Sequence, residues 1–416
     1  MQWLYNISIQ FVYFLLKIIA FFNEKIKLFI EGRKESFKKL SVISKCDKVF
    51  WIHAASLGEF EQGRPVLELL TQYYPNHKIV LTFFSPSGYQ ITKNYPYATV
   101  VCYLPFDTKK NMKRFVNLIN PEIALLIKYE FWPNLLQQLQ QNKVKTVLVS
   151  GIFRKNQIFF KSYGGFMRKK LKVFDYFFVQ NQVSKKLLNT INFNNASVSG
   201  DTRFDRVFKI VQQSKCISFI ETFINNSYTV VAGSTWKEDE ALFINYINKY
   251  ADAEQKFIIV PHLVNIGNIA NLKEALSKKT LLFSETEKLN LKLTLPDYQV
   301  LIIDTVGILT KIYAYATVAY VGGGLRTGLH NILEPAAYGV PLVFGGRKYS
   351  KFKEATDLLK QKGAFSIVSN TDFNHTFTLL KNNENLRGKM GKINKQYIKN
   401  NLGASQKIIE YIKNSI

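Results

Sequence analysis

Short apolar runs alternate with amphipathic stretches along most of the chain. From Val49 onward, runs such as KVFWIHAA, KIVLTFF and TVVCYLP have the length and composition of buried strands, and the stretches between them show helical periodicity. This alternation is typical of βαβ units that build a parallel sheet. It pauses in a polar helical stretch and restarts at YTVVAGS, so the pattern predicts two doubly wound α/β domains in succession.

The same pattern predicts the domain boundaries. Ligands of open α/β sheets bind outside the carboxyl ends of the strands, so we expect the functional site in a cleft that the two domains face. The predicted segments are an amino-terminal segment over residues 1–40, a Rossmann-like domain over 41–205, a linker over 206–226, a second Rossmann-like domain over 227–400, and a helix over 401–416 that packs back on the first domain.

The first segment contains an apolar stretch, Trp3–Phe22, which is about as long as a bilayer is thick but carries Asn6, Gln10 and Lys17. Basic residues follow it, which favours a cytoplasmic position for the rest of the chain. We expect a membrane-associated helix that spans the bilayer, lies in its interface or rests on the inner leaflet; the alternative is an ordinary buried helix. The basic residues are Lys25, Lys27, Arg33, Lys34, Lys38 and Lys39.

The amino-acid composition indicates a folded and strongly basic protein. Of its 416 residues, 47% are hydrophobic, which is enough for two domains with their own cores. The formal net charge of +26 points to a nucleic acid, an anionic membrane or a polyanionic substrate as partner. Cys46, Cys102 and Cys216 lie far apart and lack the spacing of zinc ligands, so we expect buried, reduced thiols.

A glycine triplet, Gly322–Gly324, follows a predicted strand and precedes a predicted helix near Asn331. Glycine lets the backbone approach a ligand closely, and the N–H groups of a helix start suit a phosphate, so we expect a phosphate cradle here. The spacing matches neither a P-loop nor a dinucleotide fingerprint. Glu334 falls in the first turn of the helix, where its carboxylate can accept hydrogen bonds from a ribose diol. The alternative is a glycine-rich turn with Asn331 as a helix cap.

Two glutamates follow predicted strands in the first domain. Ser56 and Glu59 in HAASLGEF fit a capping box, in which each side chain satisfies a backbone N–H at the helix start. Glu130 in KYEFWPNLL repeats the arrangement, and two carboxylates at strand ends are what an acid/base site needs. Each glutamate alone is also explained as a helix-start residue. Arg203 and Asp205 stand at the junction of the domains, where a cation can face the cleft.

Taken together, these stretches resemble one family, the 3-deoxy-D-manno-octulosonic acid (Kdo) transferases of lipopolysaccharide biosynthesis. The resemblance implies a GT-B fold, with two Rossmann-like domains facing a cleft, and a membrane anchor at the amino terminus. It extends over nearly the whole chain, and several motifs in order are more specific than any one of them. The motifs are HAASLGEF, YLPFD, KYEFWPNLL, GDTRFD, AGSTWKEDE, DTVGIL and GLHNILEPAAYGVPLVFG.

The resemblance also implies roles for individual residues. Glu59 looks like the general base that takes the proton from the acceptor hydroxyl, and Glu130 looks like a second essential acidic residue. Arg203 stands where the family has a basic residue, usually lysine, that supports the transition state. The segments that resemble those holding CMP contain Pro261, His262, Val306, Gly307, Ile308, Asn331, Ile332, Leu333 and Glu334.

Two positions depart from the family pattern. His262 stands where relatives have an arginine, so an imidazole would replace a guanidinium contact to phosphate. Ile308 stands where relatives often have glutamate. Both departures concern the contacts to the nucleotide and leave the class of enzyme unchanged.

The implied reaction is the transfer of Kdo from CMP-Kdo to the lipid A precursor (lipid IVA), with inversion, by a glycosyltransferase on the cytoplasmic face of the inner membrane. CMP leaves as an anion that a helix start and nearby basic groups can stabilise, so we expect no metal and no cofactor besides the donor. The positive charge of the chain would meet the phosphorylated precursor and the anionic leaflet. Family members add one, two or more Kdo units through similar motifs.

Two other functions stay open from the sequence. Another membrane-associated GT-B transferase that uses a UDP-sugar would share the glycine loop and Glu334 but not the HAASLGE turn. A non-catalytic basic protein that binds membranes or nucleic acid would also explain the charge. The basic residues are scattered and no zinc, RRM or helix-turn-helix pattern is present, so we expect no nucleic acid among the partners.

Overall fold

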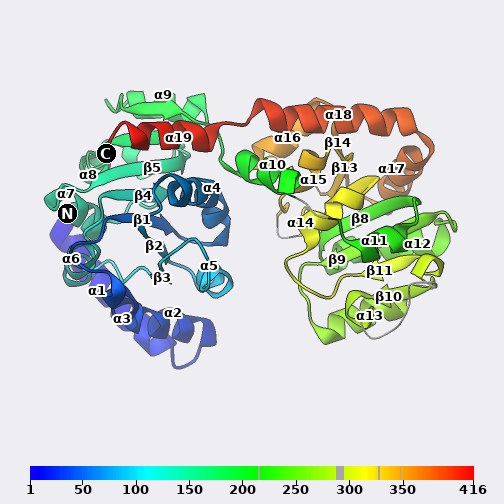
Figure 1. Ribbon diagram of the computed structural model, residues 1–416, viewed down its shortest axis with the longest axis horizontal. Coiled ribbons are helices and arrows are strands. Elements are labelled where there is room, and N and C mark those ends of the chain that lie inside the picture. Colours follow the sequence, from blue (N-terminus) through cyan, green and yellow to red (C-terminus); the bar gives the residue numbers. More distant parts are fainter. Residues whose placement is uncertain (214–215, 287–294, 327, 347) are drawn as a thin grey trace. The chain divides into compact units, whose positions relative to one another are not determined.

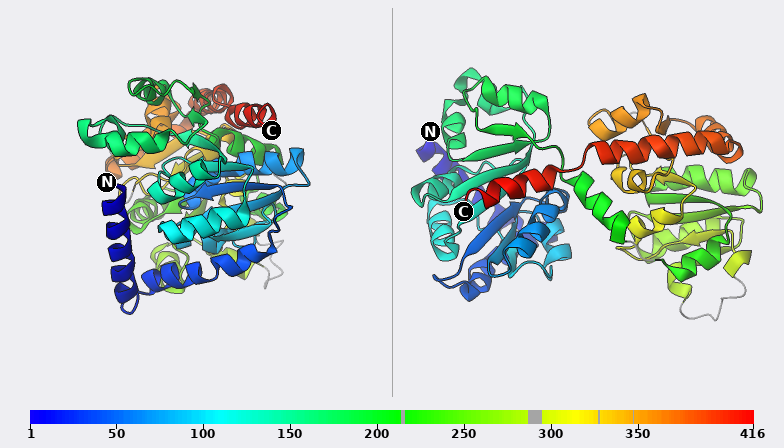
Figure 2. Two further views of the ribbon diagram at one scale, coloured as in Figure 1. Left: turned by 90° about the vertical axis from the view of Figure 1, so that its left-hand side faces the viewer. Right: turned by 45° about the horizontal axis from the view of Figure 1, so that its top comes forward.

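The computed structural model describes residues 1–213, 216–286, 295–326, 328–346 and 348–416. The contacts divide the chain into two compact units. Unit 1 contains Met1–Arg206 and Leu402–Ile416, and unit 2 contains Val207–Asn401. Figure 1 and Figure 2 show the elements of each unit.

Unit 1 is built on a parallel sheet of seven strands in the order β3-β2-β1-β4-β5-β6-β7, flanked by helices (Figure 1). The strands are β1 (Val49–Ala54), β2 (Lys78–Phe83), β3 (Val100–Tyr103), β4 (Ile123–Ile127), β5 (Lys145–Gly151), β6 (Tyr176–Val179) and β7 (Ala196–Val198). The connecting helices are α4 (Leu57–Tyr73), α5 (Pro86–Thr92), α6 (Lys109–Ile119), α7 (Pro133–Gln141), α8 (Gly165–Leu171) and α9 (Gln182–Asn189), with short 3-10 turns η1 (Leu40–Val42), η2 (Ile158–Phe160) and η3 (Ser162–Gly164).

Strand β1 shows why the sheet is buried on both faces. All six of its residues are buried, and its side chains alternate between two apolar cores. Val49 and Trp51 belong to one core, whereas Phe50 and Ile52 belong to the other. A parallel strand with helices on both faces needs apolar residues on both, which explains the continuous apolar run in the sequence. His53 is the polar exception in this strand.

The carboxyl-terminal helix α19 (Ala404–Lys413) belongs to unit 1, where Ile408, Ile409 and Ile412 are fully buried. Gly403, the residue before the helix, has no side chain that could cap it. The carboxylate of Asp205 takes this role: it accepts hydrogen bonds from the backbone N–H groups of Gly403 and Ser405, both at 2.7 Å. Asp205 therefore caps α19 from a distant part of the sequence.

Unit 2 is built on a second parallel sheet of seven strands, in the order β10-β11-β9-β8-β12-β13-β14. The strands are β8 (Tyr228–Thr235), β9 (Gln255–Pro261), β10 (Thr280–Leu282), β11 (Val300–Ile302), β12 (Val318–Val321), β13 (Leu342–Gly345) and β14 (Ala364–Ile367). The helices are α10 (Arg203–Gln213), which begins in unit 1, α11 (Ser218–Ile224), α12 (Lys237–Lys249), α13 (Ile266–Ala275), α14 (Leu309–Ile312), α15 (Leu333–Tyr338), α16 (Lys353–Lys360), α17 (Asn370–Asn382) and α18 (Glu384–Asn400), with 3-10 turns η4 (Phe283–Glu285), η5 (Leu295–Asp297) and η6 (Tyr313–Tyr315).

Two parallel seven-stranded sheets with flanking helices confirm the predicted doubly wound fold class. Strand β10 was not predicted from the sequence. It has only three residues and lies at the edge of its sheet, so its apolar run is too short to be recognised. The segment predicted as a linker, residues 206–226, contains most of α10 and all of α11. The prediction of three buried thiols was wrong, because Cys102 is buried but Cys46 and Cys216 are exposed.

The amino-terminal segment folds into three helices, α1 (Gln2–Ile19), α2 (Glu24–Lys34) and α3 (Ser36–Lys39). None of the residues of α1 is fully buried, and Phe21 and Phe22 in the turn after it are 87% and 88% exposed. Across the described part of the chain, no helix is both long and apolar enough to cross a membrane. The large exposed apolar residues of α1 are Trp3, Leu4, Ile7, Phe11, Val12, Phe14, Leu15, Ile18 and Ile19.

Helix α1 is attached to unit 1 by polar side chains. The hydroxyl of Tyr5 donates to the carboxylate of Asp107 at 2.7 Å, and the amide of Gln2 donates to Asn134 at 2.8 Å. Asp107 also accepts from the backbone N–H groups of Asn134 and Leu135 at the start of α7. Burial raises the pKa of Asp107 to about 6, against the effect of these hydrogen bonds.

Replacing Asp205 with alanine removes both acceptor oxygens at the start of α19. We expect the free energy of unfolding to fall by about 1 kcal/mol, the usual cost of losing a helix cap. Urea unfolding followed by circular dichroism measures the loss. Asp205→Asn keeps one acceptor oxygen and should lose less. An unchanged midpoint for Asp205→Ala would mean that the apolar face of α19 alone holds the helix in place.

Candidate active site

The order of the strands in unit 1 reverses between β1 and β4, so both carboxyl ends lie side by side at this point. In β1 and β4 the register pairs Phe50 with Ile123 and His53 with Leu126. Glu59 lies in the first turn of α4, after β1, and Glu130 follows β4. Open α/β sheets bind ligands where the strand order reverses, so the topology places both predicted carboxylates at the expected edge.

Glu130 is buried and held by two donors. The indole N–H of Trp132 donates to Glu130 Oε2 at 2.6 Å, and Nε2 of His53 lies 3.0 Å from the same oxygen. Only 5% of Glu130 is exposed, and His53 is fully buried. The ring of Trp132 stacks on Phe84, with centroids 4.9 Å apart, so the donor is itself fixed by packing. His53 and Trp132 were not identified from the sequence as partners of Glu130.

Glu59 makes a different contact from the predicted one. Ser56 is the residue before α4, but its hydroxyl caps no backbone N–H and instead donates to the carboxylate of Glu59. The predicted capping box is therefore wrong, because the serine oxygen accepts no backbone N–H and its hydroxyl is turned to the carboxylate of Glu59. Glu59 is half-buried in the first turn, where the helix dipole favours its negative charge.

Lys128 joins the two glutamate loops, and the sequence reasoning missed it. It follows β4 with a positive φ of 72°, a strained conformation for a residue other than glycine. Burial lowers the pKa of the Lys128 ammonium, Glu59 and Asp201 oppose this effect, and Arg203 and Arg154 add to it. Acidic and basic groups from four loops therefore lie at this edge of the sheet. The positive φ of Lys128 has no signal in the sequence.

Arg203 is engaged with its own segment. Its Nε and Nη2 atoms donate to Asp201 Oδ2 at 2.9 and 2.7 Å, and its backbone N–H donates to Asp201 Oδ1 at 2.9 Å. The structure therefore brings Arg203 to the same set of charges as Glu59, through Lys128. Asp205, its predicted neighbour, caps α19 instead.

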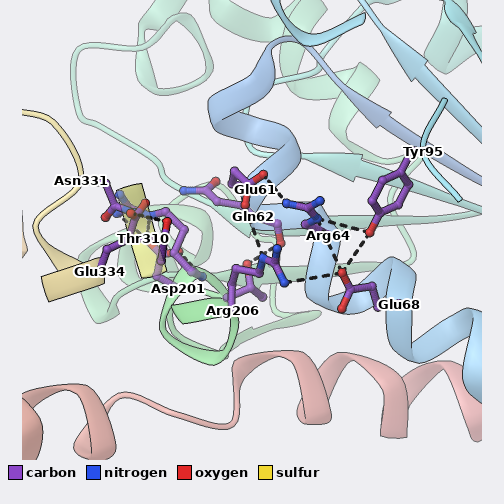
Figure 3. Close-up of polar contacts among 12 residues, drawn as sticks. Glu61, Gln62, Arg64, Glu68, Tyr95, Asp201, Arg206, Thr310, Asn331 and Glu334 are labelled. Carbon is purple, nitrogen blue, oxygen red and sulfur yellow. Dashed lines mark hydrogen bonds and ion pairs between the residues drawn. The ribbon is translucent and has the colours of Figure 1, made fainter. Parts of the chain in front are cut away.

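An ion-pair network anchors helix α4 behind this edge (Figure 3). Arg64 donates to Glu61 at 2.9 Å, and Arg206 lies 3.6 Å from Glu61 and 3.7 Å from Glu68. Tyr95 donates to Glu68 at 3.0 Å. These contacts tie the helix that carries Glu59 to the segment that carries Arg203, so they keep the two loops in place.

In unit 2, a buried aspartate connects the loops at the corresponding reversal, between β8 and β12. Asp239 accepts hydrogen bonds from the backbone N–H of Trp236 at 2.9 Å, the backbone N–H of Gly323 at 3.0 Å and the hydroxyl of Tyr320 at 2.6 Å. Burial raises the pKa of Asp239, and these hydrogen bonds oppose the shift. Asp239 was not identified from the sequence.

The glycine triplet Gly322–Gly324 serves the packing of these loops. The backbone N–H of Gly322 donates to Gly233 at 2.9 Å, and that of Gly323 donates to Asp239, so both point into the protein. A Cβ at Gly322 would collide with the carbonyl of Ser234, and one at Gly324 with that of Gly345. The predicted phosphate cradle therefore receives no N–H from Gly322 or Gly323 in this structure. Residue 327 in the same loop lies outside the described residues.

His262 lies in an aromatic stack. Its ring stacks on Trp236 with centroids 4.7 Å apart and on His330 with centroids 4.4 Å apart. The indole of Trp236 donates to His330 Nε2 at 3.0 Å. Burial lowers the pKa of His262, which favours the neutral form of its ring. Pro261 ends strand β9 just before it.

The remaining predicted nucleotide residues meet at the start of α15. Asn331 Nδ2 donates to Glu334 Oε1 at 2.9 Å, and the hydroxyl of Thr310 donates to Glu334 Oε2 at 2.6 Å (Figure 3). Thr310 belongs to α14, directly after the predicted turn Val306–Ile308. The structure therefore joins this turn with Glu334. Ile332 and Leu333 are buried, whereas Val306 is 79% exposed and Gly307 has a φ of 97°.

Comparisons with known proteins agree with the motifs. A family model described as 3-Deoxy-D-manno-octulosonic-acid transferase (kdotransferase) matches residues 30–206. The chain is 28% identical to the 3-deoxy-D-manno-octulosonic acid transferase of Aquifex aeolicus over 349 residues, which are 82% of this chain and 88% of that protein. It is 25% identical to a bifunctional glycosyltransferase/methyltransferase of Fusobacterium nucleatum, where the match covers 88% of this chain but only 57% of that protein.

The fold is also found in solved structures. The UDP-GlcNAc 2-epimerase of Neisseria meningitidis, determined with UDP-GlcNAc bound, has a TM-score of 0.61 at 14% identity and covers 88% of this chain and 100% of its own. At this identity the likeness concerns the fold alone. Together with the two parallel sheets, it confirms the GT-B class predicted from the sequence.

Burial lowers the pKa of His330 from 6.5 to about 4, and the neighbouring His262 adds to the shift. Between these values the unfolded chain binds a proton that the folded chain does not, so the contribution of this group to stability is complete above pH 6.5 and is lost as the pH falls towards 4. NMR titration of the histidine ring protons, assigned with His330→Gln, should give a midpoint near pH 4. A midpoint near 6.5 would contradict the buried stack.

Proposed function

Because this chain carries the Kdo transferase family domain and is similar to Kdo transferases over more than four-fifths of its length, we propose that it is a glycosyltransferase that moves Kdo from CMP-Kdo to the lipid A precursor. The observation that carries the proposal is the pair of carboxylates, Glu59 and Glu130, at the point where the strand order of unit 1 reverses.

Glu59 is the proposed general base. It is half-buried, and Ser56 fixes its carboxylate by a hydrogen bond that leaves acceptor capacity for an incoming hydroxyl. The base takes the proton while the acceptor oxygen attacks the anomeric carbon of Kdo and the bond to the CMP phosphate breaks. Attack from the side opposite the leaving group gives inversion. Lys128 and Arg203 supply positive charge at the same edge of the sheet.

Unit 2 is the proposed donor-binding unit. The carboxylate of Glu334 is fixed by Asn331 and Thr310, and a carboxylate has about four lone-pair sites, so a ribose hydroxyl can still donate to it. Burial lowers the pKa of His262, and in the proposed complex its ring contacts the donor phosphate by an N–H group. We propose that the departing CMP is therefore stabilised by hydrogen bonds at this position, where relatives use a guanidinium.

We further propose that the enzyme works at the cytoplasmic face of the inner membrane. Helix α1 exposes a long row of large apolar side chains, and lysines of α1 and α2 border them. Lys17, Lys27 and Lys34 line a hollow of about 600 Å³ between these helices, together with Phe21 and Ile30. Apolar residues flanked by lysines are typical of a helix that lies in the interface of an anionic leaflet, where the lipid acceptor is found.

The test of the proposed function is donor selectivity. The purified protein is incubated with a lipid A precursor and either CMP-Kdo or a UDP-sugar, and the release of CMP or UDP is followed. We expect CMP release that depends on the acceptor and no UDP release. Activity with UDP-sugars alone would replace this proposal by a different GT-B transferase.

Replacing Glu59 with glutamine keeps the size of the side chain but removes its basicity. We expect turnover to fall at least about a hundredfold, because a positioned base contributes about 10²–10⁴ to a rate, with an almost unchanged urea midpoint. The steady-state rate of CMP release measures the effect. Normal turnover would return Glu59 to the role of a helix-start residue.

Ser56→Ala is the matched control. A helix-capping serine would cost about 1 kcal/mol of stability on replacement. Because the hydroxyl donates to Glu59 and caps no backbone N–H, we expect Ser56→Ala to reduce turnover and to change the unfolding free energy by less than about 0.5 kcal/mol. A loss of stability without a change in turnover would favour the capping role after all.

We propose that the transfer proceeds without a metal ion, since the glycosidic phosphate of CMP-Kdo is already activated and hydrogen-bond donors and cations of the chain can stabilise the leaving anion. Dialysis against EDTA followed by assay in chelator should leave at least about nine-tenths of the rate, whereas loss of a required ion typically removes most of the activity. Activity that falls with EDTA and returns with Mg²⁺ would overturn this proposal.

A further inference from the structure

A buried histidine lies behind Glu130 and has no role in the function proposed above. His53 is the polar exception in the apolar strand β1, and its side chain is fully buried. Both ring nitrogens have partners: Nδ1 lies 2.9 Å from the hydroxyl of Thr82 and 3.1 Å from its carbonyl oxygen, and Nε2 lies 3.0 Å from Glu130 Oε2. Thr82 is the residue opposite His53 in the neighbouring strand β2.

Two of these hydrogen bonds have a fixed direction. The indole N–H of Trp51 can only donate, and it lies 2.9 Å from the hydroxyl oxygen of Thr82. An ionised carboxylate can only accept, so Nε2 of His53 carries a proton and donates it to Glu130. The hydroxyl of Thr82 keeps its own proton for donation, and Nδ1 of His53 lies within its reach. Trp51, Thr82, His53 and Glu130 form one chain of donors that ends on the carboxylate.

Glu130 is thus held by two donors on one oxygen. His53 and Trp132 both donate to Oε2, and within the described part of the chain Oε1 accepts no hydrogen bond. Hydrogen bonds to a carboxylate favour its ionised form. The indole of Trp132 is neutral, and the ring of His53 is also neutral when Thr82 donates to its Nδ1, so in that arrangement the two donors fix the side chain without cancelling its negative charge.

We infer that His53 is a positioning residue for Glu130: as the neutral Nε2–H tautomer set by Thr82 and Trp51, it orients the carboxylate, keeps it ionised and leaves Oε1 for the reaction. This inference deepens the proposed function and rests on it for the role of Glu130. The transition state of glycosyl transfer carries positive charge on the sugar, so a fixed, ionised carboxylate at this edge stabilises it.

Other charged groups share this edge and bear on any pH profile. They interact with Lys128 and Tyr129, the two residues before Glu130, and the variants tested below leave all of them unchanged. They are Lys128 and Tyr129 on the loop of Glu130 itself, Glu59 on α4, Arg154 after β5, and Asp201 and Arg203 after β7.

The first part of the test reads the tautomer of His53 without any substrate. In protein labelled with ¹⁵N-histidine, His53 is assigned by comparison with His53→Gln, and its two ring nitrogen shifts are measured at pH 7. We expect a protonated Nε2 and an unprotonated Nδ1. Thr82→Val keeps the shape of the side chain but removes its hydroxyl, so Nδ1 should become protonated and donate to the carbonyl of residue 82, while Nε2 keeps its proton for Glu130. Two protonated nitrogens, or a protonated Nδ1, in the wild type would overturn the inference.

The second part reads the consequence for the reaction. His53→Leu removes the donor, and Trp132→Phe removes the other donor while the aromatic ring can still stack on Phe84. In both variants we expect kcat to fall about tenfold or more and the acid limb of the kcat/KM profile to move up by about one pH unit, with KM for the donor little changed. His53→Gln, which can donate in the same place, should recover most of the loss.

A second histidine supplies the matched control. His77 Nε2 lies 2.9 Å from Glu122 in the same sheet, before strands β2 and β4, at the opposite edge from Glu130. His77→Gln should leave the pH profile unchanged even if it lowers stability. An unchanged profile in Trp132→Phe and His53→Leu, or the same shift in His77→Gln, would refute the positioning role. A wild type without Kdo transfer would instead refute the proposed function and leave the tautomer result standing.

Discussion

The parallel register of β1 with its neighbours is the constraint on which unit 1 depends. It places His53 opposite Thr82 in β2 on one side and opposite Leu126 in β4 on the other, so the loops after these three strands start at the same edge of the sheet. A slip of one residue would turn His53 to the other face of the sheet and replace its contacts by apolar ones. Glu59, Lys128 and Glu130 then lie together because the strands end together.

In unit 2, the loops at the edge of the sheet are held together by a different set of contacts. Its loops are joined by the buried carboxylate of Asp239, which binds backbone N–H groups from two of them, and by glycines that permit close approach. The aromatic stack of Trp236, His262 and His330 fills the space between the loops after β8, β9 and β12. The guanidinium of Arg326 lies over the indole of Trp236, 5.7 Å from the centroid of the ring, and 3.5 Å from the carboxylate of Glu238.

The sequence predicts much of this architecture and less of its chemistry. Buried strands such as β1 are visible because both faces of a parallel strand are apolar, whereas β10 is too short to leave a pattern. Ser56 looks like a cap in the sequence, but its hydroxyl donates a hydrogen bond to the carboxylate of Glu59. His53 gave a usable signal, a polar residue inside an apolar strand, while the positive φ of Lys128 and the partners of Asp239 depend on contacts between distant segments.

The most direct test of the account is mass spectrometry of the lipid A precursor after incubation with the purified protein and CMP-Kdo. The account predicts that the mass of the precursor increases by whole Kdo residues and that the same incubation with Glu59→Gln yields little or no product. The number of added residues also shows whether the enzyme transfers one unit or more. An unchanged precursor with the folded wild type would contradict Kdo transfer to this acceptor, and a sugar acquired from a UDP donor would point to a different transferase.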